Sequence, residues 1–189
     1  KISEHKDTVQ LAVVSRLVPF KQWPRIFRTL FDKSLSNRHK KFTLHIIGAG
    51  PWRTVQEIKS SVPKIFWNRI FFWGWQPNPL SLMENFDAML CGYPEEEALG
   101  LNVLEATNMR LPTVAFRGGP FDEVIEHGRN GWLFESESVD LVESLDAILE
   151  KLIDIKMCSK QALTFEMSGR YNHRFSEERF NNFIIELLS

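Results

Sequence analysis

The feature that most restricts the fold of this chain is the alternation of short apolar runs with helix-like segments between Val9 and Phe134. Fully apolar runs of strand length suit a sheet covered on both faces, which is the usual state of a parallel sheet. Helix-like stretches lie between them at 24–35, 52–61, 100–109 and 122–126. The alternation predicts an α/β fold: a Rossmann-like, doubly wound parallel sheet with helices on both faces. The expected strands are Val9–Ser15, Phe42–Gly48, Arg69–Gly74, Phe86–Gly92, Pro112–Phe116 and Gly131–Phe134.

Length and composition favour one domain. The chain has 189 residues, of which 43% are hydrophobic and 25% charged, and this suits a single globular domain over residues 1–189. Residues 1–8 resemble a linker and the chain begins at Lys1, so we expect a longer parent chain. Apolar residues at helical spacing after Ser138 and after Ser176 predict a helical C-terminal third that packs against the sheet.

Charge and cysteine usage exclude several classes of protein. Lys and Arg total 23 against 24 for Asp and Glu, so the chain lacks the positive field that draws proteins to nucleic acid. Cys91 and Cys158 lack metal-ligand or CxxC spacing, so we expect free thiols in a reducing cytoplasm. No apolar run approaches the roughly 20 residues that span a bilayer, which predicts no transmembrane segment.

Other common sites are not indicated. The third glycine of a dinucleotide fingerprint beginning at Gly48 would fall at position 53, where Arg53 stands, so NAD binding is not expected. The five histidines show no metal-ligand spacing, and no metal or cofactor is expected. The default expectation for the six tryptophans is packing in the core or between domains.

The stretch EEEALGLNVLE, from Glu95 to Glu105, predicts a ligand site. It follows a predicted strand, and ligands in open α/β sheets bind at the carboxyl ends of strands. The helix that Gly100 opens has unpaired amides in its first turn and a positive dipole end, which favour a phosphate. Glu105 lies about 7.5 Å further along the axis, on the face of Leu101 and Met109, where a carboxylate can accept hydrogen bonds from ribose hydroxyls. The spacing therefore suits a nucleotide sugar, and Glu105 is not expected to be merely solvated.

The same residues resemble a known family. Glu97 and Glu105 are separated by seven residues, and EALGLNVLEATNMRLPTVAFRGGPFDEVIEHGRNGWLF resembles the C-terminal, donor-binding domain of GT-B retaining glycosyltransferases of family 4, also called glycosyl transferases group 1. VVSRLVPFK, LHIIGAGPWR, RIFFWGW and the closing RFSEERFNNFIIELL match further segments in the same order. Leu99 in place of an aromatic residue, Arg110 in place of a glycine, and Gln22 after Lys21 depart from the pattern and leave the sugar and base open.

The resemblance implies roles for particular residues. Arg16 and Lys21 would bind the donor diphosphate, Glu97 the transferred sugar and Glu105 the ribose. The resemblance also implies donor contacts from the amides of Leu99 and Gly100 to the sugar and of Leu101 and Asn102 to the diphosphate. Gly48 and Gly50 would line the cleft, and the loop at Gly74 and Trp75 would pass near the base. Glu123 could contact the donor, or could simply charge the start of a helix.

The function that the resemblance implies is that of a retaining hexosyltransferase. It would move a sugar from a UDP-sugar, or a GDP-sugar, to a glycan or lipid-linked acceptor in bacterial glycan or cell-envelope polysaccharide synthesis. The acceptor site would lie on a missing N-terminal domain that residues 170–189 contact, so the chain alone is expected to bind donor without transferring sugar. The expected location is the cytoplasm, with peripheral attachment of the full-length protein to the inner face of the membrane. A noncatalytic nucleotide-sugar sensor and a GT-B-like nucleotide-sugar epimerase remain as alternatives.

Overall fold

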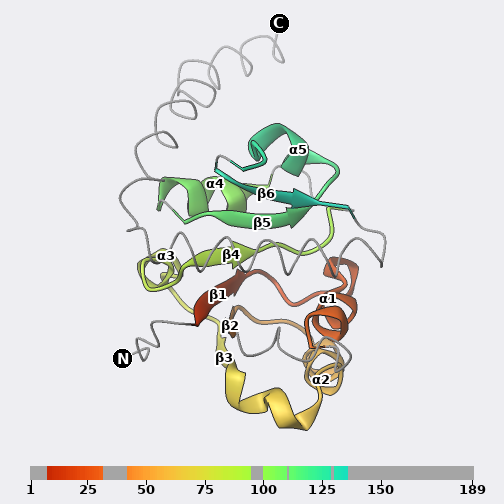
Figure 1. The fold of residues 1–189 in the computed structure, drawn as a ribbon. Coiled ribbons are helices and arrows are strands. Elements are labelled where there is room, and N and C mark those ends of the chain that lie inside the picture. Colours follow the sequence, from red (N-terminus) through yellow and green to blue (C-terminus); the bar gives the residue numbers. More distant parts are fainter. Residues whose placement is uncertain (1–7, 32–41, 95–99, 110, 129, 136–189) are drawn as a thin grey trace, which may run out of the picture.

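The fold is a six-stranded parallel sheet with helices on both faces (Figure 1). The computed structural model describes residues 8–31, 42–94, 100–109, 111–128 and 130–135. The strand order is β3-β2-β1-β4-β5-β6, and all neighbouring pairs are parallel. This confirms the predicted fold class, and each predicted run contains one strand: β1 (Val9–Val14), β2 (Phe42–Ile47), β3 (Ile70–Gly74), β4 (Ala88–Leu90), β5 (Thr113–Phe116) and β6 (Gly131–Phe134).

The helices connect the strands and agree in place with the predicted stretches. The four predicted helices are α1 (Trp23–Leu30), α2 (Trp52–Ser60), α4 (Leu101–Asn108) and α5 (Pro120–Val124). The sequence did not predict α3 (Leu80–Met83) or the 3₁₀ helices η1 (Pro19–Lys21) and η3 (Lys64–Arg69), because they are too short to show a helical period. The helices predicted after Ser138 and after Ser176 lie outside the described residues, as does the proposed contact of residues 170–189.

Alternate residues of the central strands enter two separate hydrophobic clusters. On one face, Leu11 and Leu44 pack with residues of α1, α2 and η3, among them Phe27 and Phe66. On the other face, Ala12 and its neighbours pack with α3, α4 and α5. Because both faces are covered, the strands are apolar nearly throughout, which is the pattern that made them recognisable in the sequence.

The tryptophans divide between the core and the surface. Trp23 and Trp132 are buried, as expected. Trp52, Trp67, Trp73 and Trp75 are instead 37 to 74% exposed, so they do not pack in the core, and packing between domains stays a prediction for them. Cys91 is buried and is not part of a disulfide, as predicted, and Cys158 lies outside the described residues. No helix in the described ranges has both the length and the apolar character to cross a bilayer.

His45 is a polar side chain held inside the sheet between β1 and β3. Its Nδ1 accepts a hydrogen bond from Trp73 Nε1 at 3.2 Å, and its Nε2 lies 2.9 Å from Gln10 Oε1. Since the indole N–H can only donate, the ring is neutral and its proton is on Nε2, donated to Gln10. Phe71 stacks on the ring with centroids 5.1 Å apart. Burial lowers the pKa of His45 from 6.5 to about 4.

This depressed pKa predicts a pH-dependent stability. In the unfolded chain His45 binds a proton below about pH 6.5, whereas in the folded chain it does so only below about pH 4. The contribution of neutral His45 to the free energy of unfolding is therefore fully present above pH 6.5 and is lost as the pH falls from 6.5 to 4. Between pH 7 and pH 5 the native chain should lose about 2 kcal/mol more unfolding free energy than a His45→Gln variant, which cannot titrate. Urea unfolding at both pH values measures this difference. Equal losses in the two proteins would show that His45 does not control the dependence.

Candidate functional site

The candidate site lies where the strand order reverses. β1 pairs with β2 on one side and with β4 on the other, so the chain leaves these strands toward opposite halves of the sheet. Loops that diverge at such a switch point leave a crevice beyond the carboxyl ends of the strands. The loop after β1 leads into η1, and the loop after β4 leads toward α4. These two loops and the start of α4 therefore surround the crevice.

A cavity of about 300 Å³ occupies this crevice. Five of its lining residues were predicted from the sequence as donor contacts, and they come from two segments far apart in the chain. Three others were not predicted, although the end of β1 and the residue after it could have been included because a strand's carboxyl end borders such a crevice. The lining consists of Val14, Ser15, Arg16, Phe20, Lys21, Leu101, Asn102 and Glu105.

Lys21 is positioned by the loop after β4. Its side chain is only 9% exposed, and its Nζ lies 5.4 Å from the centroid of the Phe20 ring. Its backbone carbonyl accepts a hydrogen bond from the Tyr93 amide at 3.4 Å. A Cβ at Gly92 would lie 3.2 Å from both Cβ and Cδ of Lys21, so the glycine permits this close contact. A fixed cation at the cavity wall follows from this packing.

The first turn of α4 faces the same cavity. Gly100 caps the helix with φ 60°, a left-handed conformation that favours glycine. The amides of Val103 and Leu104 donate to the Gly100 carbonyl, whereas helix geometry gives the amides of Leu101 and Asn102 no intrahelical acceptor. Two backbone donors and the positive end of the helix dipole therefore lie near Arg16 and Lys21, an arrangement that favours an anion.

Glu105 lies one turn further along α4. Its side chain is exposed to solvent, but it also lines the cavity. The expectation that Glu105 is more than solvated surface therefore rests on its place at the cavity alone. Leu101 beside it is 58% exposed. The carboxylate therefore stands at the rim of the cavity and is accessible to a ligand from solvent.

Gly48 and Gly50, which were predicted to line the cleft, bring two loops into close contact. A Cβ at Gly48 would lie 1.9 Å from the Ser15 carbonyl oxygen, and one at Gly50 equally close to that of Leu17. These glycines let the loop after β2 touch the loop after β1, where the Leu17 amide donates to the Ala49 carbonyl at 2.9 Å. They support the wall behind the cavity and are not among its lining residues.

The remaining predicted residues either lie away from the cavity or fall outside the described residues. Gly74 ends β3 with φ 69°, and Trp75 after it is 72% exposed; neither lines the cavity. Glu97 and Leu99 lie outside the described residues. Their roles, like those of the residues above, stay predictions.

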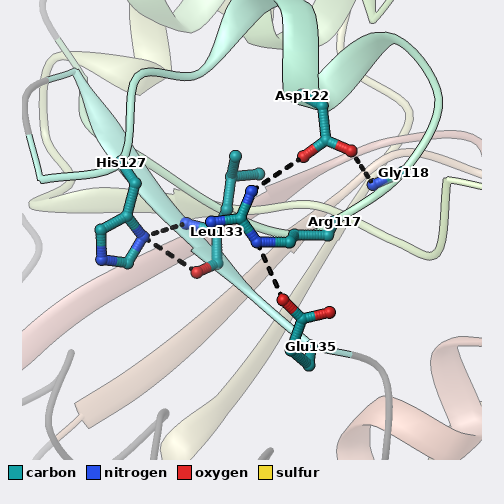
Figure 2. A network of polar contacts seen from close by, with 6 residues as sticks. All are labelled: Arg117, Gly118, Asp122, His127, Leu133 and Glu135. Atoms are coloured by element: carbon teal, nitrogen blue, oxygen red, sulfur yellow. Dashed lines mark hydrogen bonds and ion pairs between the residues drawn. The ribbon is translucent and has the colours of Figure 1, made fainter.

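A polar network holds the loop after β5 at the same edge of the sheet (Figure 2). Arg117 Nε lies 2.9 Å from Glu135 Oε1, and its Nη1 lies 3.3 Å from Asp122 Oδ1. The other Asp122 oxygen accepts a hydrogen bond from the Gly118 amide at 2.8 Å. Asp122 and Glu123 are in the first turn of α5, so a charged helix start describes Glu123 at least as well as a donor contact does.

Comparison with known proteins gives a family match over most of the chain. The family model described as Glycosyl transferases group 1 matches residues 8–152. The sulfoquinovosyl transferase SQD2 of Arabidopsis thaliana is 27% identical over 155 residues, which are 79% of this chain and 29% of that protein. The N-acetyl-alpha-D-glucosaminyl L-malate synthase of Bacillus anthracis is 40% identical over 68 residues, 36% of this chain and 18% of that protein. The chain thus spans less than a third of these relatives.

Solved structures share the fold at low sequence identity. Anabaena HepE in complex with UDP and glucose superposes with a TM-score of 0.75 at 24% identity, over 96% of this chain and 48% of that one. S. aureus TarM, in a complex that includes UDP, superposes with a TM-score of 0.74 at 19% identity, over 99% of this chain and 37% of that one. This likeness establishes the fold. The present chain spans about half or less of the length of each of these neighbours.

The contact at Gly48 predicts a large loss of stability on substitution. In Gly48→Ala the new Cβ would meet the Ser15 carbonyl oxygen at 1.9 Å, in a backbone with φ 141°, so the loops after β1 and β2 must separate. We expect a loss of about 3 kcal/mol in unfolding free energy, measured by urea denaturation. Gly128→Ala is the matched control, because φ is 78° there but nothing lies within 4 Å of the added Cβ. It should lose only about 1 kcal/mol, and a Gly48 variant no less stable than this control would contradict the close contact.

Proposed function

Because the chain belongs to the glycosyl transferases group 1 family, we propose that it is the donor-binding domain of a retaining glycosyltransferase that uses a nucleoside-diphosphate sugar. The observation that carries this proposal is the cavity at the β1–β4 switch point. Arg16, Lys21 and the first turn of α4 surround it, and Glu105 stands at its rim. Two cations, two free helix amides and one carboxylate match a diphosphate joined to a ribose.

The proposed chemistry is stabilisation of a leaving group. When the bond from the sugar to the diphosphate breaks, negative charge develops on the departing phosphate. Arg16, Lys21 and the helix that Gly100 caps would stabilise this charge without a metal ion. Lys21 suits this role because its packing against Phe20 and Gly92 fixes the cation before the donor arrives. Retention of configuration, with the leaving phosphate assisting the incoming hydroxyl, is part of the proposal.

The donor that we propose is a UDP-sugar, with a GDP-sugar as the second choice. The Anabaena and S. aureus structures contain UDP, which supports uracil as the base. In this proposal Glu105 binds the ribose, Glu97 binds the sugar, and the loop at Gly74 and Trp75 lies beside the base. An exposed indole such as Trp75 offers a flat apolar surface of the kind that a base covers.

The acceptor in this proposal is a glycan or lipid-linked molecule of bacterial envelope or polysaccharide synthesis. Its site would be supplied by a part of the protein outside these 189 residues, so the chain alone would bind donor without efficient transfer. In the full-length protein the reaction would take place in the cytoplasm, at the inner face of the membrane. Without the second domain, the alignment and exclusion of water that lower the barrier are missing.

Two other functions would differ from a transferase in what the full-length protein forms from the donor. A nucleotide-sugar sensor would bind the donor without turnover even in the full-length parent, and an epimerase would interconvert the sugar without an acceptor. Mass and stereochemical analysis of products from the full-length protein separates these from a retaining transferase. A product in which the sugar is joined to the acceptor with its anomeric configuration unchanged supports the proposal, and either other outcome refutes it.

The first prediction from this function concerns the nucleotide. Because Glu105 is proposed to bind the ribose, Glu105→Ala should weaken the binding of bare UDP by roughly 1.5 to 3 kcal/mol, the contribution of charge-assisted hydrogen bonds. Isothermal calorimetry on the 189-residue chain measures this change. Glu57→Ala removes a carboxylate that is also exposed, from α2 and outside the cavity, and should leave the affinity unchanged. Unaltered UDP affinity in a folded Glu105 variant would refute the ribose assignment.

The second prediction separates Glu97 from its neighbours in sequence. Glu97→Ala should weaken the binding of UDP-sugar while leaving bare UDP affinity nearly intact, because only the sugar is proposed to contact this carboxylate. Glu95→Ala and Glu96→Ala are matched controls and should have mild effects on both ligands. Calorimetric titration with UDP and with UDP-glucose gives the comparison. If Glu96 were the sensitive position, the alignment of this loop would be wrong by one residue.

A further inference from the structure

The exposed apolar side chains of this chain are not scattered. Among the described residues nine large hydrophobic side chains are exposed, and all but Leu101 lie between residues 52 and 80. Single exposed apolar residues are normal, but a contiguous group marks an interaction surface. The eight are Trp52, Ile65, Trp67, Phe71, Phe72, Trp73, Trp75 and Leu80.

These residues belong to two regions of the molecule. Trp52 opens α2 after the carboxyl end of β2, and Trp75 follows the carboxyl end of β3, so both lie at the edge of the sheet that carries the candidate site. Ile65 and Trp67 are on η3, before β3, and hence at the opposite, amino edge. From there Phe71 and Phe72 continue along β3, the outermost strand. The second group consists of Ile65, Trp67, Phe71 and Phe72, and nucleotide binding at the carboxyl edge does not explain its exposure.

Basic residues accompany the second group. Residues 52–80 contain four cations, Arg53, Lys59, Lys64 and Arg69, against one carboxylate, Glu57, although the chain as a whole has a net charge of −1. Lys59 and Lys64 are exposed. Phe71 and Phe72 point to opposite faces of the sheet, and Phe72 is the one on the face of Lys59 and Trp67. We define the basic aromatic patch as Ile65, Trp67 and Phe72 together with Lys59, Lys64 and Arg69.

The patch includes a hollow as well as protruding side chains. A cavity of about 230 Å³ opens between Phe27, Lys59, Val62, Trp67, Ile70 and Phe72. Lys59 Nζ lies 5.2 Å from the centroid of the Phe72 ring, and Trp67 Nε1 donates to the Val62 carbonyl at 3.2 Å. Trp67 is therefore held in place while half of its surface remains in solvent, at 50% exposure. Lys59 and the anchored aromatic rings are therefore already arranged to contact a surface whose interior is apolar and whose exterior is negatively charged.

We propose that the basic aromatic patch docks this protein on the surface of an anionic lipid bilayer. Aromatic side chains are enriched at the level of lipid headgroups, and basic residues near a membrane are attracted to its negative surface potential. Among the described residues no strand pairs with the outer edge of β3. Such an edge could not enter hydrocarbon without losing its hydrogen bonds to water, so the contact stays at the headgroup level. This inference deepens the membrane attachment in the proposed function and rests on it for its biological role.

Charge distinguishes this occupant from a second copy of the chain. In a symmetric dimer across β3 the same patch would meet itself, and Lys59, Lys64 and Arg69 would face their own counterparts. Like charges brought together in this way oppose association. An anionic bilayer neutralises the same cations and accepts the apolar rings.

The test is sedimentation of the 189-residue chain with lipid vesicles, in the absence of nucleotide. Vesicles of equal parts phosphatidylcholine and phosphatidylglycerol should bind the chain at least about tenfold more strongly than pure phosphatidylcholine vesicles, since each basic residue near the surface contributes roughly fivefold. Lys59→Glu should weaken binding to the anionic vesicles by about tenfold or more. Arg53→Glu is the matched control: it makes the same charge change at the opposite end of α2, near the other edge of the sheet, and should have a clearly smaller effect.

The apolar contribution is tested separately. Ile65→Ser removes a side chain that is 66% exposed, so the fold should survive, which thermal unfolding verifies, while vesicle binding should fall several-fold. Trp52→Ala, at 74% exposure, is the control and should bind vesicles like the native chain. Absence of binding, equal binding to both vesicle types, or equal effects of Lys59→Glu and Arg53→Glu would overturn the proposal. A dimer that Ile65→Ser dissociates, without vesicle binding, would overturn it in favour of a contact between copies. UDP affinity, measured separately, should not depend on any of these results.

Discussion

The position of β1 at the centre of the parallel sheet is the constraint on which the rest of the structure depends. β1 pairs with β2 in full register from Val9 to Val14 and with β4 through Leu11 and Ala12, so the sheet grows in both directions from it. The chain must therefore leave β1 and β4 toward opposite sides, and the crevice between them is a result of the strand order. Arg16, Lys21 and α4 meet in this crevice although about 80 residues of sequence separate them. The candidate chemistry is thus a consequence of topology before it is a consequence of particular side chains.

Apart from β3, four of whose five residues are exposed, the strands were predictable from sequence because burial on both faces leaves them apolar. β2, for example, has five of its six residues buried, which produces a run that only a covered sheet explains. The helix at Gly100 was predictable because a glycine before an apolar period is a local signal. By contrast, α3 has four residues and η3 six, so neither contains enough turns for a period to appear. Their positions are fixed by tertiary contacts such as those of Met83 and Phe66.

The site was predictable in part. Arg16 and Lys21 were assigned from the family resemblance, and Glu105 also because it falls on a helix face; all three line the cavity, and their roles stay predictions. The function of Gly48 and Gly50 was not predictable, because their close contacts are with Ser15 and Leu17, more than 30 residues earlier in the chain. The exposure of Glu105 and of Trp67 was also beyond a local pattern. Whether a residue on an amphipathic element is covered depends on which other segment packs there, and sequence period alone does not specify this.

The two surfaces of the domain are compatible with simultaneous use. The site opens at the carboxyl edge between β1 and β4, whereas the basic aromatic patch follows η3 and the outer strand β3. β3 is two strands from β1, about 10 Å across the sheet, and η3 is a further strand length of about 15 Å from the carboxyl edge. A chain that rests on a membrane through Trp67 and Phe72 therefore keeps the cavity beside Lys21 open to solvent, and a soluble donor can enter it. Under the proposed function, this separation would let a donor arrive from water while a lipid-linked acceptor remained in the bilayer.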